Sequence, residues 1–193
     1  MRRHYAALLR RAALLPSLPL VASIHAAALR RGAVLVPSLI HAYSACGDPI
    51  SAHSVFDELP WQEQTLSART ALASSMSAHG RCQDVLLLFQ GREGEMDDKA
   101  VTVVLSACAR AGMVGEGREV FARVRRPALQ HYTCMVEMLA RAGKVEEAEG
   151  LVARKEARPD RVIFAVLLSA CRAHGRVDVA ERVARLMRHY GIA

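Results

Sequence analysis

One short motif recurs five times along this 193-residue chain. Each copy centres on a glycine, and the copies span residues 38–56, 71–89, 103–121, 134–152 and 166–184. The central residues are Gly47, Gly80, Gly112, Gly143 and Gly175, at successive spacings of 33, 32, 31 and 32 residues. A period in this range, held over five copies, is typical of repeat proteins in which one supersecondary unit is stacked on the next.

Each copy predicts two helices joined at its glycine. In the fourth copy, apolar residues recur at helical spacing before Gly143, at Met135, Met138 and Leu139, and again from Val145 onward. The glycine falls where a helix ends in a left-handed residue, a conformation that costs glycine least. No stretch alternates as a strand does, so we expect helix–turn–helix units throughout.

Two further positions in each copy predict how the helices pack. Five residues after the glycine lies a small residue: Ala52, Val85, Gly117, Ala148 or Ala180. Nine residues after it lies Phe56, Phe89, Phe121, Val152 or Ala184. Helices approach closely only where a side chain is small, and the larger residue then fills the space against the next copy. We therefore predict an all-α solenoid whose first helices form a concave binding wall.

Charge is distributed unevenly along the chain. Residues 1–47 contain six arginines and no acid, residues 48–153 contain 11 basic and 15 acidic residues, and residues 154–193 contain 9 basic and 4 acidic residues. The net charge of +7 is therefore not one continuous nucleic-acid-binding stripe. At 52% hydrophobic residues the chain is too apolar to be disordered, and five cysteines are too few for a disulfide-stapled domain.

The first 31 residues allow two interpretations. An arginine-rich, acid-free start is typical of an organelle transit peptide, mitochondrial in preference to plastid. Alternatively, the segment is a degraded helical pair. Pro16 and Pro19 interrupt any secretory apolar core, and no run of about 20 apolar residues predicts a membrane span.

Signals for catalysis or cofactor binding are weak. No His-x-Glu or Cys-x-x-Cys element is present, so neither a zinc deaminase nor a zinc finger is expected. We expect Cys46, Cys108 and Cys171 to be buried core thiols, and His79 and His174 to lie at helix C-termini. Trp61 either stacks on a base or, the favoured interpretation, covers the core. The prediction is a non-enzymatic chain without metal or other cofactor.

These motifs resemble the pentatricopeptide repeat family over residues 33–190. HYTCMVEMLARAGKVEEAEGLV (131–152) is similar to the last short repeat of the plant subclass that mixes long and short (PLS) repeats. RPDRVIFAVLLSACRAHGRVDVAERVA (158–184) is similar to the start of its C-terminal extension (E) motif. The resemblance implies a right-handed α-solenoid, with a targeting-like segment or partial repeat in 1–32, four repeats in 33–157, and a truncated extension-like pair in 158–193.

The resemblance further implies sequence-specific binding of single-stranded organelle RNA, one base per repeat. In the family two residues per repeat recognise the base. Here the pairs are Pro37 with Thr65, Thr70 with Asp97, Thr102 with Ala128, and Thr133 with Asp160; Ala165 is a fifth first position. The family's Thr–Asp combination favours guanine, and hydroxyl and carboxylate groups can both hydrogen-bond a base edge. Alternatively, Asp97 and Asp160 only cap the helices that follow them.

Partners follow from the same resemblance. An extension-like segment implies recruitment of a partner such as a cytidine deaminase in C-to-U RNA editing, or another processing enzyme. The acidic balance of residues 48–153 instead favours a protein-binding scaffold. A degenerate or truncated member of the family is a third interpretation.

Overall fold

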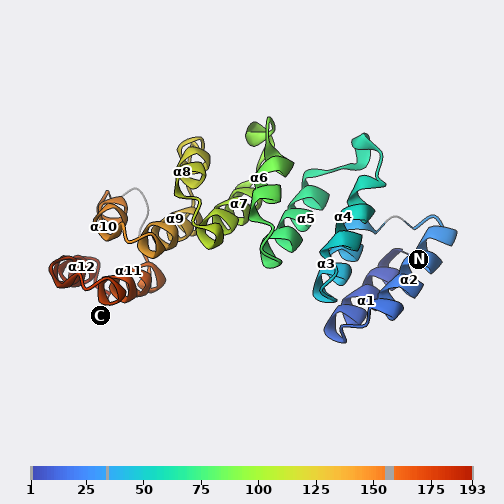
Figure 1. Ribbon diagram of the computed structural model, residues 1–193, viewed down its shortest axis with the longest axis horizontal. Helices are drawn as coiled ribbons and strands as arrows, with labels where there is room; N and C mark the ends of the chain where they lie inside the picture. The colour runs from blue at the N-terminus through green and yellow to red at the C-terminus, as the bar shows by residue number, and fades with distance from the viewer. Residues whose placement is uncertain (1, 34, 155–158, 193) are drawn as a thin grey trace. The chain divides into compact units, whose positions relative to one another are not determined.

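A computed structural model describes residues 2–33, 35–154 and 159–192. In these residues the secondary structure is entirely helical (Figure 1). The α-helices are α1 (Arg2–Leu14), α2 (Leu18–Arg30), α3 (Val36–Ala45), α4 (Pro49–Asp57), α5 (Leu66–Ala78), α6 (Cys82–Phe89), α7 (Asp98–Ala111), α8 (Val114–Ala122), α9 (Leu129–Arg141), α10 (Val145–Ala153), α11 (Arg161–Ala173) and α12 (Val177–His189). Short 3₁₀ turns η1 (Trp61–Glu63) and η2 (Glu93–Glu95) precede α5 and α7.

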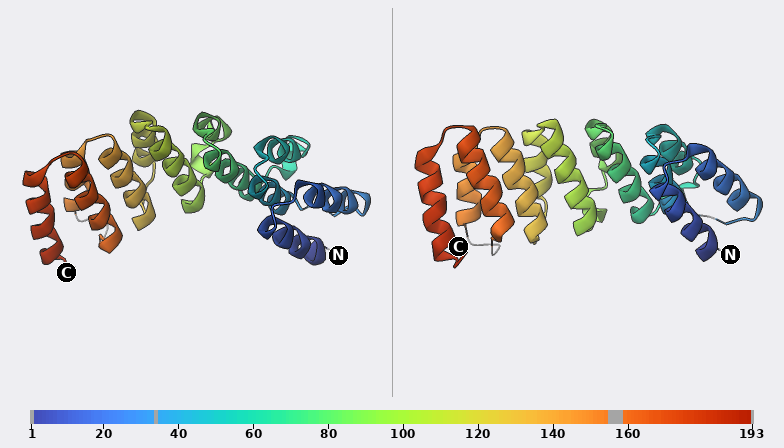
Figure 2. Two further views of the ribbon diagram at one scale, coloured as in Figure 1. Left: turned by 60° about the horizontal axis from the view of Figure 1, so that its bottom comes forward. Right: turned by 90° about the horizontal axis from the view of Figure 1, so that it is seen from below.

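The contacts divide the chain into an N-terminal unit, Met1–Gln90, and a C-terminal unit, Gly91–Ala193. The described residues of each unit form three helical pairs, and the first helices of successive pairs pack on one another. In the N-terminal unit α3 packs against α1 and α5; in the C-terminal unit α9 packs against α7 and α11 (Figure 2). This confirms the predicted all-α solenoid class. The predicted domain boundary between residues 157 and 158 lies outside the described residues.

The chain's first residues fold as a helical pair. Tyr5, Leu9 and Ala12 are buried on α1, and Val21 and Ile24 are buried on α2. Both helices pack against α3. Apolar spacing in this segment therefore serves packing, as the helical-pair interpretation expects.

All five motif glycines end a first helix in the left-handed region, with φ between 65° and 76°. Gly112 is the C-cap of α7, and a side chain with a Cβ would be strained there. The small residue five positions on is explained best at Gly117. A Cβ built there would lie 3.4 Å from the Cβ atom of Cys108 on the paired helix α7, and 2.5 Å from the Sδ and Cε atoms at the end of the Met138 side chain on α9. Gly117 therefore lets α8 lie close to α7 and leaves room for the Met138 side chain.

Two burial predictions are wrong. Trp61, expected to cover the core, is 76% exposed at the start of η1, in the link between α4 and α5. Cys46 is half-buried as the C-cap of α3, whereas Cys108 and Cys171 are buried as predicted. His79 and His174 are C-cap residues of α5 and α11, as predicted. None of the described helices has both the length and the hydropathy of a membrane span.

Candidate nucleic-acid interface

The second residue of each predicted base-recognition pair is the N-cap of a first helix. Thr65, Asp97, Ala128 and Asp160 precede α5, α7, α9 and α11. The Asp97 Oδ1 atom accepts a hydrogen bond from the Ala100 amide at 2.8 Å, and the Asp160 Oδ1 atom accepts one from the Ile163 amide at 3.0 Å. Capping therefore occupies one oxygen of each carboxylate and leaves its Oδ2 atom available to a ligand.

Three first residues, Thr70, Thr102 and Thr133, lie in the second turns of α5, α7 and α9, five residues past the cap, and Ala165 has the same place on α11. Pro37 instead lies in the first turn of α3, two residues past its cap, Leu35. Thr102 and Thr133 are half-buried, and their hydroxyls donate to the carbonyls of Asp98 and Leu129, at 2.7 and 3.0 Å. Ala165 is exposed on α11. Thr70 differs: it is only 4% exposed, and its hydroxyl has no hydrogen-bond partner among the described residues.

Three of the four predicted pairs have both residues in the same unit. Thr133 with Asp160 stands on the packed helices α9 and α11, and Thr102 with Ala128 stands on α7 and α9. In the N-terminal unit the remaining complete pair, an exposed Pro37 and Thr65, lines one cavity of about 300 Å³. Thr70 and Asp97 belong to different units.

A buried histidine supplies a side-chain bond at the start of α9 that does not depend on the Ala128 side chain, from the N3 position back to the amide of the N-cap residue. The His131 Nδ1 atom accepts a hydrogen bond from the Ala128 amide at 3.0 Å. Its Nε2 atom must then carry the proton of a neutral ring, and it donates to the Asp98 carbonyl at 2.9 Å. His131 thereby ties the start of α9 to the start of α7 and fixes the register of two neighbouring recognition positions.

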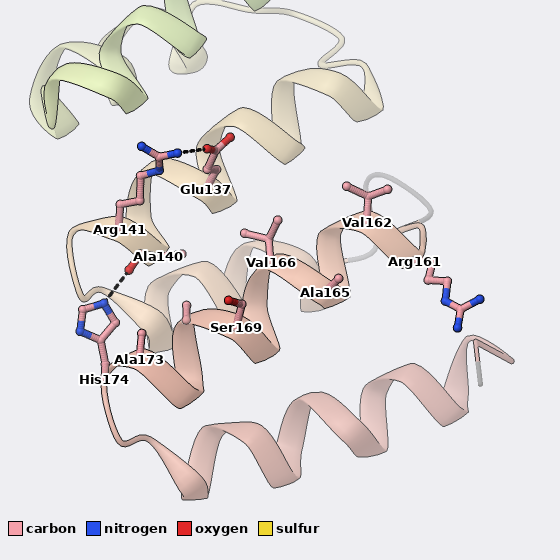
Figure 3. Close-up of a pocket in the computed structure, with 11 residues that line it drawn as sticks. Glu137, Ala140, Arg141, Arg161, Val162, Ala165, Val166, Ser169, Ala173 and His174 are labelled. Atoms are coloured by element: carbon pink, nitrogen blue, oxygen red, sulfur yellow. Dashed lines mark hydrogen bonds and ion pairs between the residues drawn. The ribbon is translucent and has the colours of Figure 1, made fainter.

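A groove of about 680 Å³ lies between α9 and α11 (Figure 3). Its α11 wall is mostly apolar and includes Val162, Ala165 and Val166. Arg161 lies at one end of the groove. At the other end Arg141 pairs with Glu137 at 2.7 Å, and the His174 Nε2 atom lies 3.0 Å from the Ala140 carbonyl oxygen. The groove follows the first-helix wall on which the Thr133–Asp160 pair stands.

The second helices of the C-terminal unit are linked by ion pairs. Arg118 on α8 pairs with Glu147 on α10, and Arg182 on α12 pairs with Glu149 on α10 at 2.7 Å. Arg176, just before α12, pairs with Glu146. The Arg176 and Arg182 charges are therefore already compensated by carboxylates on α10.

A family model described as PPR repeat matches residues 38–61, 100–126, 130–154 and 162–192, more than half of the chain. The chain belongs to the pentatricopeptide repeat family. A mitochondrial pentatricopeptide repeat-containing protein of Arabidopsis thaliana is 37% identical over 154 residues, which cover 77% of this chain and 24% of that protein. A chloroplastic one from the same plant is 36% identical over 155 residues, covering 76% and 21%. The chain thus spans about a quarter of the length of these relatives.

The fold is also that of a solved pentatricopeptide repeat protein. The structure of PPR10 in complex with an 18-nt psaJ RNA element matches with a TM-score of 0.79 and 21% identity, over 98% of this chain and 30% of that one. A crystal structure of PPR10 from maize matches with a TM-score of 0.68 and 24% identity, over 97% of this chain and 29% of that one. At such identities the likeness shows the fold alone.

Several residues of the wall formed by the first helices could not be predicted from the sequence. No predicted role covered His131, Arg161 or Val162, although the 31–33-residue period already placed α11 on this wall. Cys134 is also on the wall: burial raises the pKa of its thiol, which hydrogen-bonds Ser106 at 3.3 Å. Among the described residues no three His, Cys, Asp or Glu side chains are grouped to hold a metal ion.

Proposed function

We propose that this chain binds single-stranded RNA sequence-specifically along its first helices, in a plant organelle. Relatives from both mitochondria and chloroplasts match. Mitochondria are the first choice because of the arginine-rich, acid-free start of the chain, and chloroplasts are the alternative. We place the chain in the PLS subclass on its 131–152 and 158–184 motifs. It would act without chemistry of its own, positioning a transcript for a partner enzyme such as a cytidine deaminase; this step rests on the extension-like motif.

The observation that carries the RNA proposal is the Thr133–Asp160 pair. Thr133 is in the second turn of α9, and Asp160 caps the helix packed beside it. The Thr133 hydroxyl hydrogen is committed to the Leu129 carbonyl, so the hydroxyl oxygen can only accept a further hydrogen bond. The free Asp160 oxygen is also an acceptor.

Two hydrogen-bond acceptors on neighbouring helices select a base edge that presents donors. Guanine presents N1–H and N2–H₂ on its Watson–Crick edge, whereas adenine presents an acceptor at N1. The pair therefore favours guanine by its own chemistry, in agreement with the preference that the family resemblance implies. Thr102 faces Ala128, which offers no side-chain hydrogen bond, so we expect little base preference there.

The experiment is RNA binding by the full chain to matched oligonucleotides that differ at one position, guanine against adenine. Asp160→Asn keeps the N-cap, because asparagine caps as well as aspartate, but gives the second side-chain position a donor. We expect the guanine preference to fall at least about fivefold. Asp48→Asn is the control, because Asp48 caps α4, a second helix, through the Ser51 amide at 2.9 Å. Equal loss in both variants would contradict base recognition by Asp160.

A protein-binding scaffold is the second candidate, favoured by the apolar α11 wall of the groove in Figure 3. Salt dependence separates the two functions. RNA binding releases counterions, so its affinity must fall steeply as salt rises. Absence of any salt-sensitive RNA binding at low ionic strength would remove the RNA proposal and leave the scaffold.

A further inference from the structure

Four exposed leucines lie at the turn between α1 and α2, which we call the leucine tip: Leu14, Leu15, Leu18 and Leu20. Leu14 is 81% exposed and Leu15 70%, and the other two are each more than 40% exposed. The buried faces of the two helices use other residues, among them Leu9 and Val21. The leucine tip is therefore surplus to the packing of the N-terminal unit.

The turn presents these leucines in a fixed arrangement. Pro19 is in the first turn of α2, and the Ser17 carbonyl accepts the Val21 amide at 3.1 Å, which closes that turn. Pro16, within the turn itself, further limits the backbone. Leucines held outward by a stiff turn lose little conformational freedom when they enter an apolar phase.

Two exposed arginines on α1 precede the leucine tip. Arg10 and Arg11 are exposed on α1, and Arg10 lies four residues before Leu14, the last residue of α1, so these two share a helix face. Four residues of helix correspond to about 6 Å along the axis. No acidic residue is present in positions 1–47 to compensate this charge. By contrast, Arg31 at the far end of the hairpin is engaged with the Tyr5 hydroxyl.

We propose that the α1–α2 hairpin docks on the surface of an anionic lipid bilayer through the leucine tip. The axial separation of about 6 Å between Arg10 and Leu14 matches the about 5–10 Å depth to which interfacial helices bury their apolar side, so Arg10 meets the headgroups while Leu14 enters the acyl boundary. An acidic protein would satisfy Arg10 and Arg11, but it offers no fluid apolar phase to four leucines projecting from a convex turn.

Vesicle flotation of the full chain, in the absence of RNA, tests the proposal. The probes are vesicles of phosphatidylcholine alone and of equimolar phosphatidylcholine and phosphatidylglycerol. We expect binding to the anionic vesicles only. Leu14→Ser with Leu15→Ser should weaken it at least about tenfold, and Arg10→Gln with Arg11→Gln about 30-fold, since each arginine near such a surface contributes about 1 kcal/mol.

Leu87→Ser is the matched control, because Leu87 is a 65% exposed leucine elsewhere in the same unit. Its binding should equal that of the wild type. Circular dichroism shows whether each variant stays folded, and RNA affinity should be unchanged by the two serines at the tip. The proposal is overturned if neither vesicle binds, as expected for an acidic protein partner, if both bind equally, or if the serine variant binds as the wild type does.

Discussion

The two units contain the same number of helical pairs but are held together differently. In the C-terminal unit polar contacts join residues about one repeat apart: His131 to Asp98, His174 to Ala140, and Arg182 to Glu149. In the N-terminal unit Arg31 and His25, both from α2 and its C-cap, bond Tyr5 and Tyr43, which lie 26 and 18 positions away. Its α5 contains a buried threonine without a hydrogen-bond partner among the described residues.

This difference indicates which unit holds its base-recognition residues in fixed positions. A hydrogen bond contributes to specificity only if its donor and acceptor keep their places when the ligand binds. Repeat-to-repeat bonds fix the spacing of α7, α9 and α11, whereas Thr70 on α5 is covered. We therefore expect the C-terminal unit to supply the sequence specificity.

The largest expected effect comes from emptying the core of the C-terminal unit. Phe164 on α11 is fully buried among Leu167, Leu139 and Val183. Phe164→Ala should lower the free energy of unfolding by about 3–5 kcal/mol through the lost burial and the cavity. Hydrogen exchange should accelerate in residues 91–193 and stay near wild-type rates in the N-terminal unit, because repeat arrays couple mainly between neighbours.

Leu72→Ala is the mirror variant in the N-terminal unit, where Leu72 is also fully buried. It should cost about 2–5 kcal/mol and accelerate exchange in residues 2–90 instead. Equal acceleration of exchange across both units in either variant would mean that the units unfold together. The two units would then not differ in stability.

The fold could be predicted from the sequence because five copies of one motif support the same assignment of helices and turns. Each glycine turn is decided by its own backbone, so Gly47 and Gly175 could be placed without knowledge of their neighbours. Side-chain exposure could not be placed in this way. Whether Thr70 is covered or Trp61 is exposed depends on the residues of the adjoining helix or turn, which periodicity does not specify.

The same limit applies to the candidate site. The motif period placed Asp160 at a helix start, and both its predicted roles, capping and base contact, need only that position. His131 was missed because its partners lie at a cap and at a carbonyl 33 residues away. Nothing in the pattern around residue 131 distinguishes a buried bridging histidine from a surface one.

Replacing that histidine is the second test of the contrast. His131→Leu leaves the Ala128 amide and the Asp98 carbonyl without their partner, and we expect a loss of about 2–3 kcal/mol in unfolding free energy. His79→Leu in the N-terminal unit should cost less than about 0.5 kcal/mol, because His79 is exposed and bonds only within its own helix. Chemical denaturation measures both. Similar losses would show that the repeat-to-repeat bond adds nothing.

A smaller effect is expected from the ion pairs between second helices. The Glu149 side chain is only 17% exposed and accepts hydrogen bonds from Arg182 at 2.7–3.0 Å. Glu149→Gln should lower the free energy of unfolding by about 1 kcal/mol. Glu137→Gln, in the more exposed pair with Arg141, is the control and should cost about half as much or less. An unchanged stability in Glu149→Gln would show that the Arg182–Glu149 ion pair adds nothing to the packing of α10 against α12.

The smallest effect is a pH dependence confined to the N-terminal unit. Burial lowers the pKa of His25 below its usual 6.5, against the opposing influence of Glu58, and its Nδ1 atom lies 3.0 Å from the Tyr43 hydroxyl. Above the unfolded-state pKa the ring is neutral in both states. As the pH falls below about 6.5 the unfolded chain takes up a proton that the folded unit resists, so stability falls until the folded pKa is reached. Hydrogen exchange between about pH 7.5 and about pH 5.5 should show this loss in residues 2–90, and His25→Gln should abolish it. A loss of equal size in that variant would assign the acid sensitivity to another group and remove His25 from the contrast between the units.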